Sequence, residues 1–194
     1  MHYPIELRFK LMSFAQRISA HDATGKELLH IKQKMFKFKE QVEIYRDSSQ
    51  KQLLFRIAAD RMIDFSANYN FTDAAGESWG GVRRQGMKSL WAAHYDIMQD
   101  GVVDMKVQEE SPWKKVMEGL LGEIPVVGFI ATYLMNPSYL VTSPSGERLL
   151  RLVKKPAIFE GKFVLERLSE IPEDDELRSL LALVMIVLLE RSRG

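Results

Sequence analysis

A turn followed by a strand-like run recurs along this 194-residue sequence, and this repeat restricts the chain to folds built from hairpins. It is clearest in residues 22–34, 73–85 and 143–155, which begin with Asp or Ser and carry Gly three residues later. The first side chain of such a turn accepts backbone hydrogen bonds, and the glycine adopts the positive φ that reverses the chain. Looser versions occur at residues 47–51 and 99–101. About five hairpins predict a mainly β protein.

Residues between these turns alternate between apolar and polar, as expected of strands with one buried face. In residues 63–71 the apolar side chains hold the odd positions, and residues 7–11 and 91–97 repeat the pattern. Antiparallel strands of this kind stack as a sandwich or close into a barrel, because open edges invite aggregation. Alternation alone leaves both architectures open.

The C-terminal segment breaks the strand pattern. Residues 179–189 read SLLALVMIVLL, which leaves no polar face for a surface helix. Acidic residues 173–176 precede the segment and Arg191 and Arg193 follow it, which suits the helix dipole at both ends. Eleven helical residues span about 16 Å, roughly half of a bilayer's hydrocarbon core. We therefore predict a helix buried in protein, such as the filling of a barrel, in preference to a membrane span.

Composition places the chain among ordinary globular proteins. It is 46% hydrophobic and 27% charged, and no linker-like stretch divides it, so we expect one domain over residues 1–194. A net charge of +1 gives no bulk attraction to nucleic acid, which we do not expect as a partner, or to acidic membranes. The sequence has no cysteine and no secretory signal pattern, and a cytoplasmic location fits best.

Residues 109–136 form the other irregular region. They combine helical spacing of apolar residues with an apolar run that is broken by Pro125 and Gly128. We interpret the segment as a crossover that lies against the barrel. A membrane-touching or ligand-covering element is the alternative.

Residues 18–38, 42–47, 53–57 and 161–168, followed by the apolar helix, resemble the tubby C-terminal-like superfamily. The resemblance is strongest to the phospholipid scramblase and LURP-one-related proteins, and it covers nearly the whole chain. The succession of hairpins ending in an apolar helix carries it, because Asp-x-x-Gly turns alone are common. It implies a closed, mostly antiparallel barrel of about twelve strands enclosing a hydrophobic C-terminal helix.

The same resemblance implies less about activity. Tubby-like domains bind phosphoinositides, scramblases are associated with calcium and lipid movement, and LURP-one-related proteins have no settled activity. This sequence lacks the cysteine cluster and Pro-rich N-terminal arm of the scramblases. Asp96, Asp100 and Asp104 also lack the order of an EF-hand loop, and we interpret them as parts of a solvated hairpin.

The sequence shows no recognisable catalytic motif. We find no nucleophile elbow and no Gly-rich phosphate loop. The four histidines, at positions 2, 21, 30 and 94, are scattered without a metal-ligand spacing. We therefore expect a protein that is not an enzyme and uses no cofactor or metal.

Basic residues are the feature with a plausible binding role. At corresponding positions of the repeats they could converge on one rim of a barrel, where they would suit phosphate oxygens. The candidate headgroup-binding residues are Lys32, Lys34, Arg83, Arg84, Lys154 and Lys155. The alternative is that they form the ordinary outward polar face of amphipathic strands.

These observations favour a non-enzymatic, scramblase-like or LURP-one-related barrel. We expect it to bind phosphoinositide or other anionic phospholipid headgroups at a membrane surface, as a peripheral protein without a transmembrane span. The alternative function is a protein-interaction or regulatory adaptor that binds a protein partner and no lipid.

Overall fold

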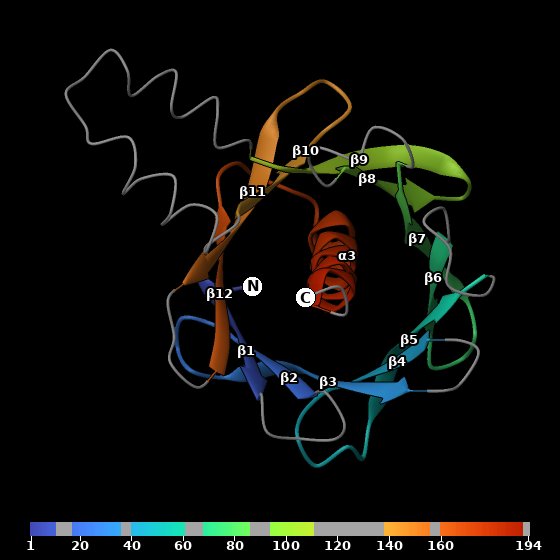
Figure 1. Cartoon of the computed structure of the whole chain (residues 1–194), viewed down its shortest axis with the longest axis vertical. Helices are drawn as coiled ribbons and strands as arrows, with labels where there is room; N and C mark the ends of the chain where they lie inside the picture. The colour runs from blue at the N-terminus through green and yellow to red at the C-terminus, as the bar shows by residue number, and fades with distance from the viewer. Residues whose placement is uncertain are drawn as a thin grey trace.

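Twelve strands and one helix are found in the described part of the computed structural model, which comprises residues 1–10, 17–35, 40–60, 68–85, 94–110, 138–155 and 160–191. The strands close into a single antiparallel barrel around the helix (Figure 1). The elements are β1 Ile5–Lys10, β2 Arg17–His21, β3 Glu27–Met35, β4 Glu40–Tyr45, β5 Leu53–Ala59, β6 Asn68–Asp73, β7 Ser78–Arg84, β8 His94–Gln99, β9 Val102–Glu109, β10 Ser138–Thr142, β11 Arg148–Lys155, β12 Glu160–Arg167 and α3 Glu173–Arg191.

Strand order around the barrel follows the chain, and β1 closes the ring by pairing with β12. Every neighbouring pair is antiparallel, so the odd-numbered strands all run in one direction. The β2–β3, β4–β5, β6–β7, β8–β9 and β10–β11 connections therefore share one end of the barrel, which we call the turn rim. The carboxyl ends of the odd-numbered strands lie at the opposite end, the far rim. The closed ring confirms the predicted barrel and excludes the sandwich.

The five hairpin connections at the turn rim are the predicted turns. In the first, Asp22 Oδ1 accepts the Thr24 backbone N–H at 2.9 Å, and Gly25 has φ of 84°. Gly76 and Gly146 occupy the same place in their repeats, with φ of 93° and 87°. Because the left-handed region is strained for residues with a Cβ, glycine recurs at this place.

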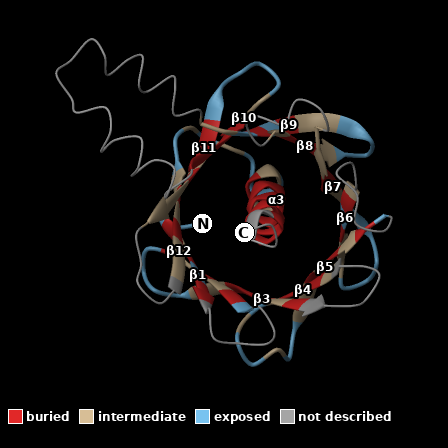
Figure 2. Ribbon diagram, viewed as in Figure 1, coloured by how far each residue is buried: buried red, intermediate tan, exposed pale blue. Residues whose placement is uncertain are grey.

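Side chains alternate between the barrel interior and its outer face. On β1 the buried residues are Ile5, Leu7 and Phe9, and on β6 they are Tyr69 and Phe71. Figure 2 shows buried segments around the ring of strands and along α3. The alternation predicted for residues 63–71 and 91–97 is thus seen from residues 68 and 94 onward, and the preceding residues lie outside the described part. The predicted crossover at 109–136 lies outside it from residue 111, although β9 and β10 on either side pair directly.

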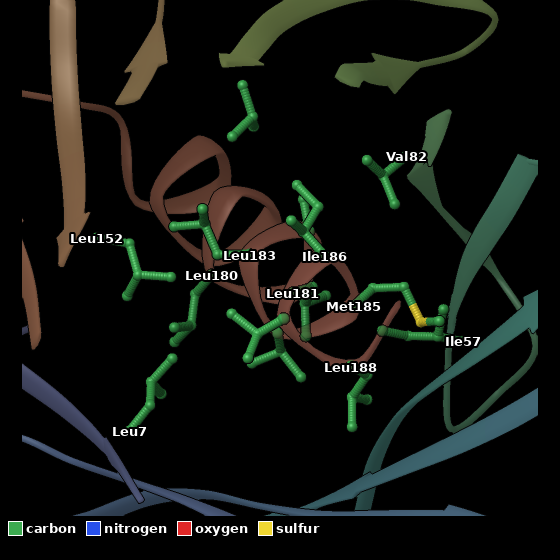
Figure 3. Close-up of a cluster of buried hydrophobic side chains, with 14 of the residues drawn as sticks. Leu7, Ile57, Val82, Leu152, Leu180, Leu181, Leu183, Met185, Ile186 and Leu188 are labelled. Atoms are coloured by element: carbon green, nitrogen blue, oxygen red, sulfur yellow. The ribbon is translucent and has the colours of Figure 1, made fainter. Parts of the chain in front are cut away.

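Helix α3 occupies the interior of the barrel, as the apolar C-terminal segment predicted. Residues 179–189 are all buried, and Leu7, Ile57, Val82 and Leu152 from four strands surround them (Figure 3). The acidic residues before the apolar run form the first turn of the helix, which therefore begins at Glu173. Within the described residues, no helix combines the length and apolar character that crossing a membrane requires.

Buried charges hold the start of α3 at the turn rim. The Arg178 side chain is 3% exposed, and its Nη1 lies 2.8 Å from Asp104 Oδ2 on β9 and 2.7 Å from Asp175 Oδ1. Its Nε donates to the carbonyl oxygen of Trp79 on β7 at 3.2 Å. These partners offset the cost of burying the guanidinium, and they fix the helix against two strands on one side of the barrel.

Removing apolar volume from α3 tests its role as the core. Leu183 is 0% exposed, so Leu183→Ala should lower the free energy of unfolding by about 2–5 kcal/mol in denaturant titrations. Val102 on β9 is 68% exposed, and Val102→Ala should change that free energy by less than about 0.5 kcal/mol. Equal effects of the two substitutions would contradict an enclosed helix.

Turn substitutions test the backbone requirement. Gln50 stands in the β4–β5 turn with φ of 55°, so Gln50→Gly should raise the free energy of unfolding by about 0.5–1 kcal/mol. Gly146→Ala should lower it by about 1 kcal/mol through strain alone, because an added Cβ would meet no atom within 4 Å. Thermal or denaturant unfolding measures both, and a stabilising Gly146→Ala would refute the argument.

Candidate functional site

The predicted basic residues lie on β3, β7 and β11, three strands that are four positions apart in the ring of twelve. Because all three are odd-numbered, their carboxyl ends share the far rim. A ring of twelve strands has a backbone diameter of roughly 24 Å, which separates three evenly spaced strands by about 20 Å. The fold therefore brings the residues toward one rim but spreads them around its circumference.

Two of the predicted residues occupy inward-facing positions. Arg84 is paired with Tyr95, and Lys154 with Phe163, and both aromatic partners are buried in the barrel. An inward position near the far rim is not the outer surface on which a bilayer would rest. The structure thus separates Arg84 and Lys154 from the outward-facing residues of the predicted set.

Arg83 faces outward on β7, across the barrel from β1. Its Nη2 lies 3.4 Å from Asp96 Oδ2, so the charge of Arg83 is opposed by a carboxylate. The three aspartates of the β8–β9 hairpin do not share a site, since Asp104 pairs with Arg178 and Asp100 lies in the turn with φ of 49°. Among the described residues, no cluster of His, Asp or Glu has a metal-binding arrangement.

Lys32 and Lys155 belong to a basic surface that the sequence did not reveal. Lys155 on β11 is opposite Lys162 on β12, and Lys162 is opposite Arg8 on β1. Arg17 on β2 is opposite Lys32 on β3. These residues alternate with buried ones, so all five face outward on the adjacent strands β11, β12, β1, β2 and β3. We call Arg8, Arg17, Lys32, Lys155 and Lys162 the basic face.

The backbone of Lys34 is opposite Gln41 of β4, two residues beyond Lys32 along β3. Its side chain lies outside the described part of the structure. A headgroup contact by Lys34 therefore stays a prediction.

A carboxylate organises the centre of the basic face. Glu6 Oε2 lies 2.6 Å from Lys162 Nζ, and Glu6 Oε1 accepts a hydrogen bond from Arg8 Nε. Burial by itself would raise the pKa of the Glu6 carboxyl, but these hydrogen bonds and charges hold it below its usual value. Glu6 thus stays ionised at neutral pH and ties strand β12 to β1 across the outer face.

The outer surface of β1–β3 is hollowed next to this carboxylate. The hollow has a volume of about 370 Å³, and we call it the β1–β3 hollow. Its walls come from three strands and the β4–β5 turn: Arg8, Arg17, Ile18, Ser19, His21, Glu27, His30 and Ser48. Two residues of the basic face, Arg8 and Arg17, therefore also line the hollow.

Strand register brings together two histidines that looked unrelated in the sequence. His30 is opposite Ser19, and His21 is opposite Glu27, on the outward sides of β2 and β3. His30 Nδ1 lies 3.1 Å from Glu27 Oε1, and the other Glu27 oxygen accepts the Ser48 N–H at 3.0 Å. In the described part of the structure, His30 Nε2 and His21 Nδ1 are buried without a hydrogen-bond partner.

Ser19, His30 and Glu27 have the residue types of a hydrolytic triad, but the necessary contact is missing. A nucleophilic serine must hydrogen-bond to the base, and His30 Nε2 has no such bond to Ser19 or to another described residue. The arrangement instead offers two guanidinium groups, two imidazoles and a hydroxyl. Donors of this kind are suited to binding an anion.

One comparison with known proteins finds a match. The model of the family described as LURP-one-related matches residues 9–120, more than half of the 194-residue chain. No curated protein and no solved structure matches. The matched range contains β2 to β9, and so most of the β1–β3 hollow.

The ion pairs of Glu6 generate a titration prediction. Lys162→Met should move the pKa of Glu6 upward, because it removes the hydrogen bond that most strongly favours the carboxylate. Since the folded-state pKa is lowered, the stabilisation is present above the ordinary pKa of a glutamate and is lost as pH falls through the folded-state value. Carboxyl ¹³C NMR titration of both proteins measures the shift, and an unchanged Glu6 pKa would contradict the pairing.

Proposed function

The chain belongs to the LURP-one-related family of the tubby C-terminal-like superfamily, and we propose that it is a non-enzymatic barrel that binds anionic phospholipid headgroups, including phosphoinositides, at a membrane surface. The observation that carries this proposal is the basic face. Its five cationic side chains lie on the outer side of five consecutive strands, an arc of about a third of the ring that has β1 at its centre and β11 and β3 at its ends.

The basic face differs from the rest of the molecule. The whole chain has a net charge of +1, whereas the basic face combines five cations with the carboxylates of Glu6, Glu27 and Glu43, a local excess of two positive charges. Such an asymmetric charge distribution orients the protein toward an anionic bilayer. Because the outer wall of a barrel is convex, the central strands β12, β1 and β2 of this arc would lie nearest a flat bilayer, and β11 and β3 would lie farther from it.

The expected binding is modest and reversible. A lysine or arginine near an anionic membrane contributes about 1 kcal/mol, so five supply at most about 5 kcal/mol. The nearby carboxylates Glu6, Glu27 and Glu43 reduce this sum, since all three lie on or beside the basic face. Binding of this strength falls steeply as the salt concentration rises.

The second candidate is a protein-interaction adaptor, in which the same face would receive an acidic protein. It predicts no difference between neutral and anionic vesicles. The membrane proposal predicts that difference and its dependence on salt, so one vesicle experiment distinguishes the two functions.

Charge reversal on the basic face tests the proposal. Arg17→Glu, Lys32→Glu and Lys155→Glu combined should reduce binding to vesicles containing phosphatidylserine and a phosphoinositide by at least about a hundredfold. Vesicle co-sedimentation at low and physiological salt measures the effect. Neutral phosphatidylcholine vesicles should bind neither protein.

A matched control has the same number of charge reversals on other parts of the barrel: Arg56→Glu, Arg83→Glu and Lys106→Glu. This variant should keep at least half of the wild-type binding, because its substitutions lie on β5, β7 and β9. The proposal is refuted if the wild-type protein fails to bind anionic vesicles, or if both triple variants lose binding equally.

A further inference from the structure

We propose that the β1–β3 hollow is a binding site for a phosphomonoester group, which it holds through His21, His30, Arg8 and Arg17. The inference deepens the proposed function, because it names the chemical group that the barrel recognises within its basic face. It rests on the walls of the hollow, which the basic face as a whole does not determine.

His21 and His30 line the hollow, and each has one imidazole nitrogen without a hydrogen-bond partner among the described residues. His30 is 8% exposed, and its Nε2 makes no hydrogen bond to any described residue. His21 Nδ1 also makes no hydrogen bond to any described residue. Buried polar atoms are nearly always paired, so two orphaned nitrogens in one hollow point to a missing partner. A phosphomonoester in the hollow would supply that partner, because a P–OH group donates to a neutral ring nitrogen and the other phosphate oxygens accept from a ring N–H.

The Glu27 carboxylate prepares His30 for this role. Its Oε1 accepts a hydrogen bond from His30 Nδ1, and its Oε2 is engaged by the Ser48 backbone N–H. Glu27 therefore holds the ring through Nδ1, and Nε2 is the ring nitrogen left without a hydrogen bond to a described residue. Glu27 also lines the hollow, so its negative charge opposes the attraction of an anion by the guanidinium groups of Arg8 and Arg17.

The number of donors favours a monoester over a diester. Arg8 and Arg17 each carry a guanidinium group with several N–H donors, and the histidines and the Ser19 hydroxyl add three further groups around the same hollow. A phosphomonoester presents three terminal oxygens and close to two negative charges, whereas a diester has two such oxygens and one charge. The monoester uses more of the donors.

A phosphomonoester can come from two sources. Phosphatidic acid and the phosphoinositides carry one at the membrane surface, and soluble sugar or inositol phosphates carry one in solution. Arg8 and Arg17 belong to both the hollow and the basic face, so a membrane on the basic face would bring its headgroups to the hollow. The chemistry recognised is the same, and the experiments below separate the sources.

The first experiment titrates the wild-type protein with inorganic phosphate and follows the histidine side chains by ¹H–¹⁵N NMR. The imidazole signals of His21 and His30 should shift and saturate, while those of His94 on the opposite side of the barrel should not move. Glycerol 3-phosphate should bind at least about tenfold more tightly than dimethyl phosphate. Absence of shifts at both His21 and His30 would overturn the proposal, whatever the variants do.

The second experiment uses substitutions that keep the size and polarity of the ring. His21→Gln and His30→Gln should each weaken glycerol 3-phosphate binding about tenfold, and His94→Gln is the matched control, which should leave it unchanged. Circular dichroism and thermal unfolding establish that each variant is folded. Equal affinity in the wild type and in both folded hollow variants would contradict the assignment.

Vesicles distinguish the sources of the phosphate. At equal surface charge, phosphatidic acid vesicles should bind the wild type more tightly than phosphatidylglycerol vesicles, and His30→Gln should abolish the preference. Binding of the soluble monoester without any vesicle binding would refute the membrane function and retain the phosphate site. Vesicle binding without preference for the monoester, and without histidine shifts, would retain the membrane function and refute the site.

Discussion

The burial of α3 is the constraint on which the rest of the structure depends. A helix that is apolar on all sides must be surrounded, and a single sheet face could cover only one of its sides. Twelve strands spaced about 4.8 Å apart and tilted by about 40° form a ring whose backbone lies about 12 Å from its axis. This distance between the strand backbone and the helix axis is close to the spacing of about 10 Å between packed layers of secondary structure. Large residues such as Leu7, Ile57 and Leu152 therefore fill the space between the strands and the helix.

Closing the ring around the helix also creates the basic face. Only the β1–β12 pairing brings Arg8, near the start of the chain, beside Lys162, near its end. Glu6 bridges the two cations and remains ionised between them. The interaction that seals the barrel on its outside is therefore part of the surface that we propose contacts the membrane, and its residues have both a structural and a binding role.

Within that surface, the residues that attract any anion differ from the residues that would select a particular ligand. Long basic side chains on neighbouring strands attract any anionic surface. His21 and His30 are different, because they are partly or fully covered, and Glu27 holds the His30 ring in one orientation. Groups held in this way select the shape and the number of oxygens of a ligand. The proposed phosphomonoester site thus adds selectivity to an otherwise electrostatic contact.

The sequence by itself determined the hairpins, their turn residues and the buried helix, because each depends on local chemistry. Asp22 and Gly25 specify a turn wherever it lies, and an all-apolar segment must be buried in any fold. The resemblance to the tubby C-terminal-like superfamily added the expectation that these hairpins form a barrel of about twelve strands. Tertiary structure decided which residues meet on the outer face, since that depends on register and ring closure between distant strands. Repeat position suggested that Arg84 and Lys154 join Lys32, but side-chain alternation turns them inward, while register assembles the basic face and the histidine pair.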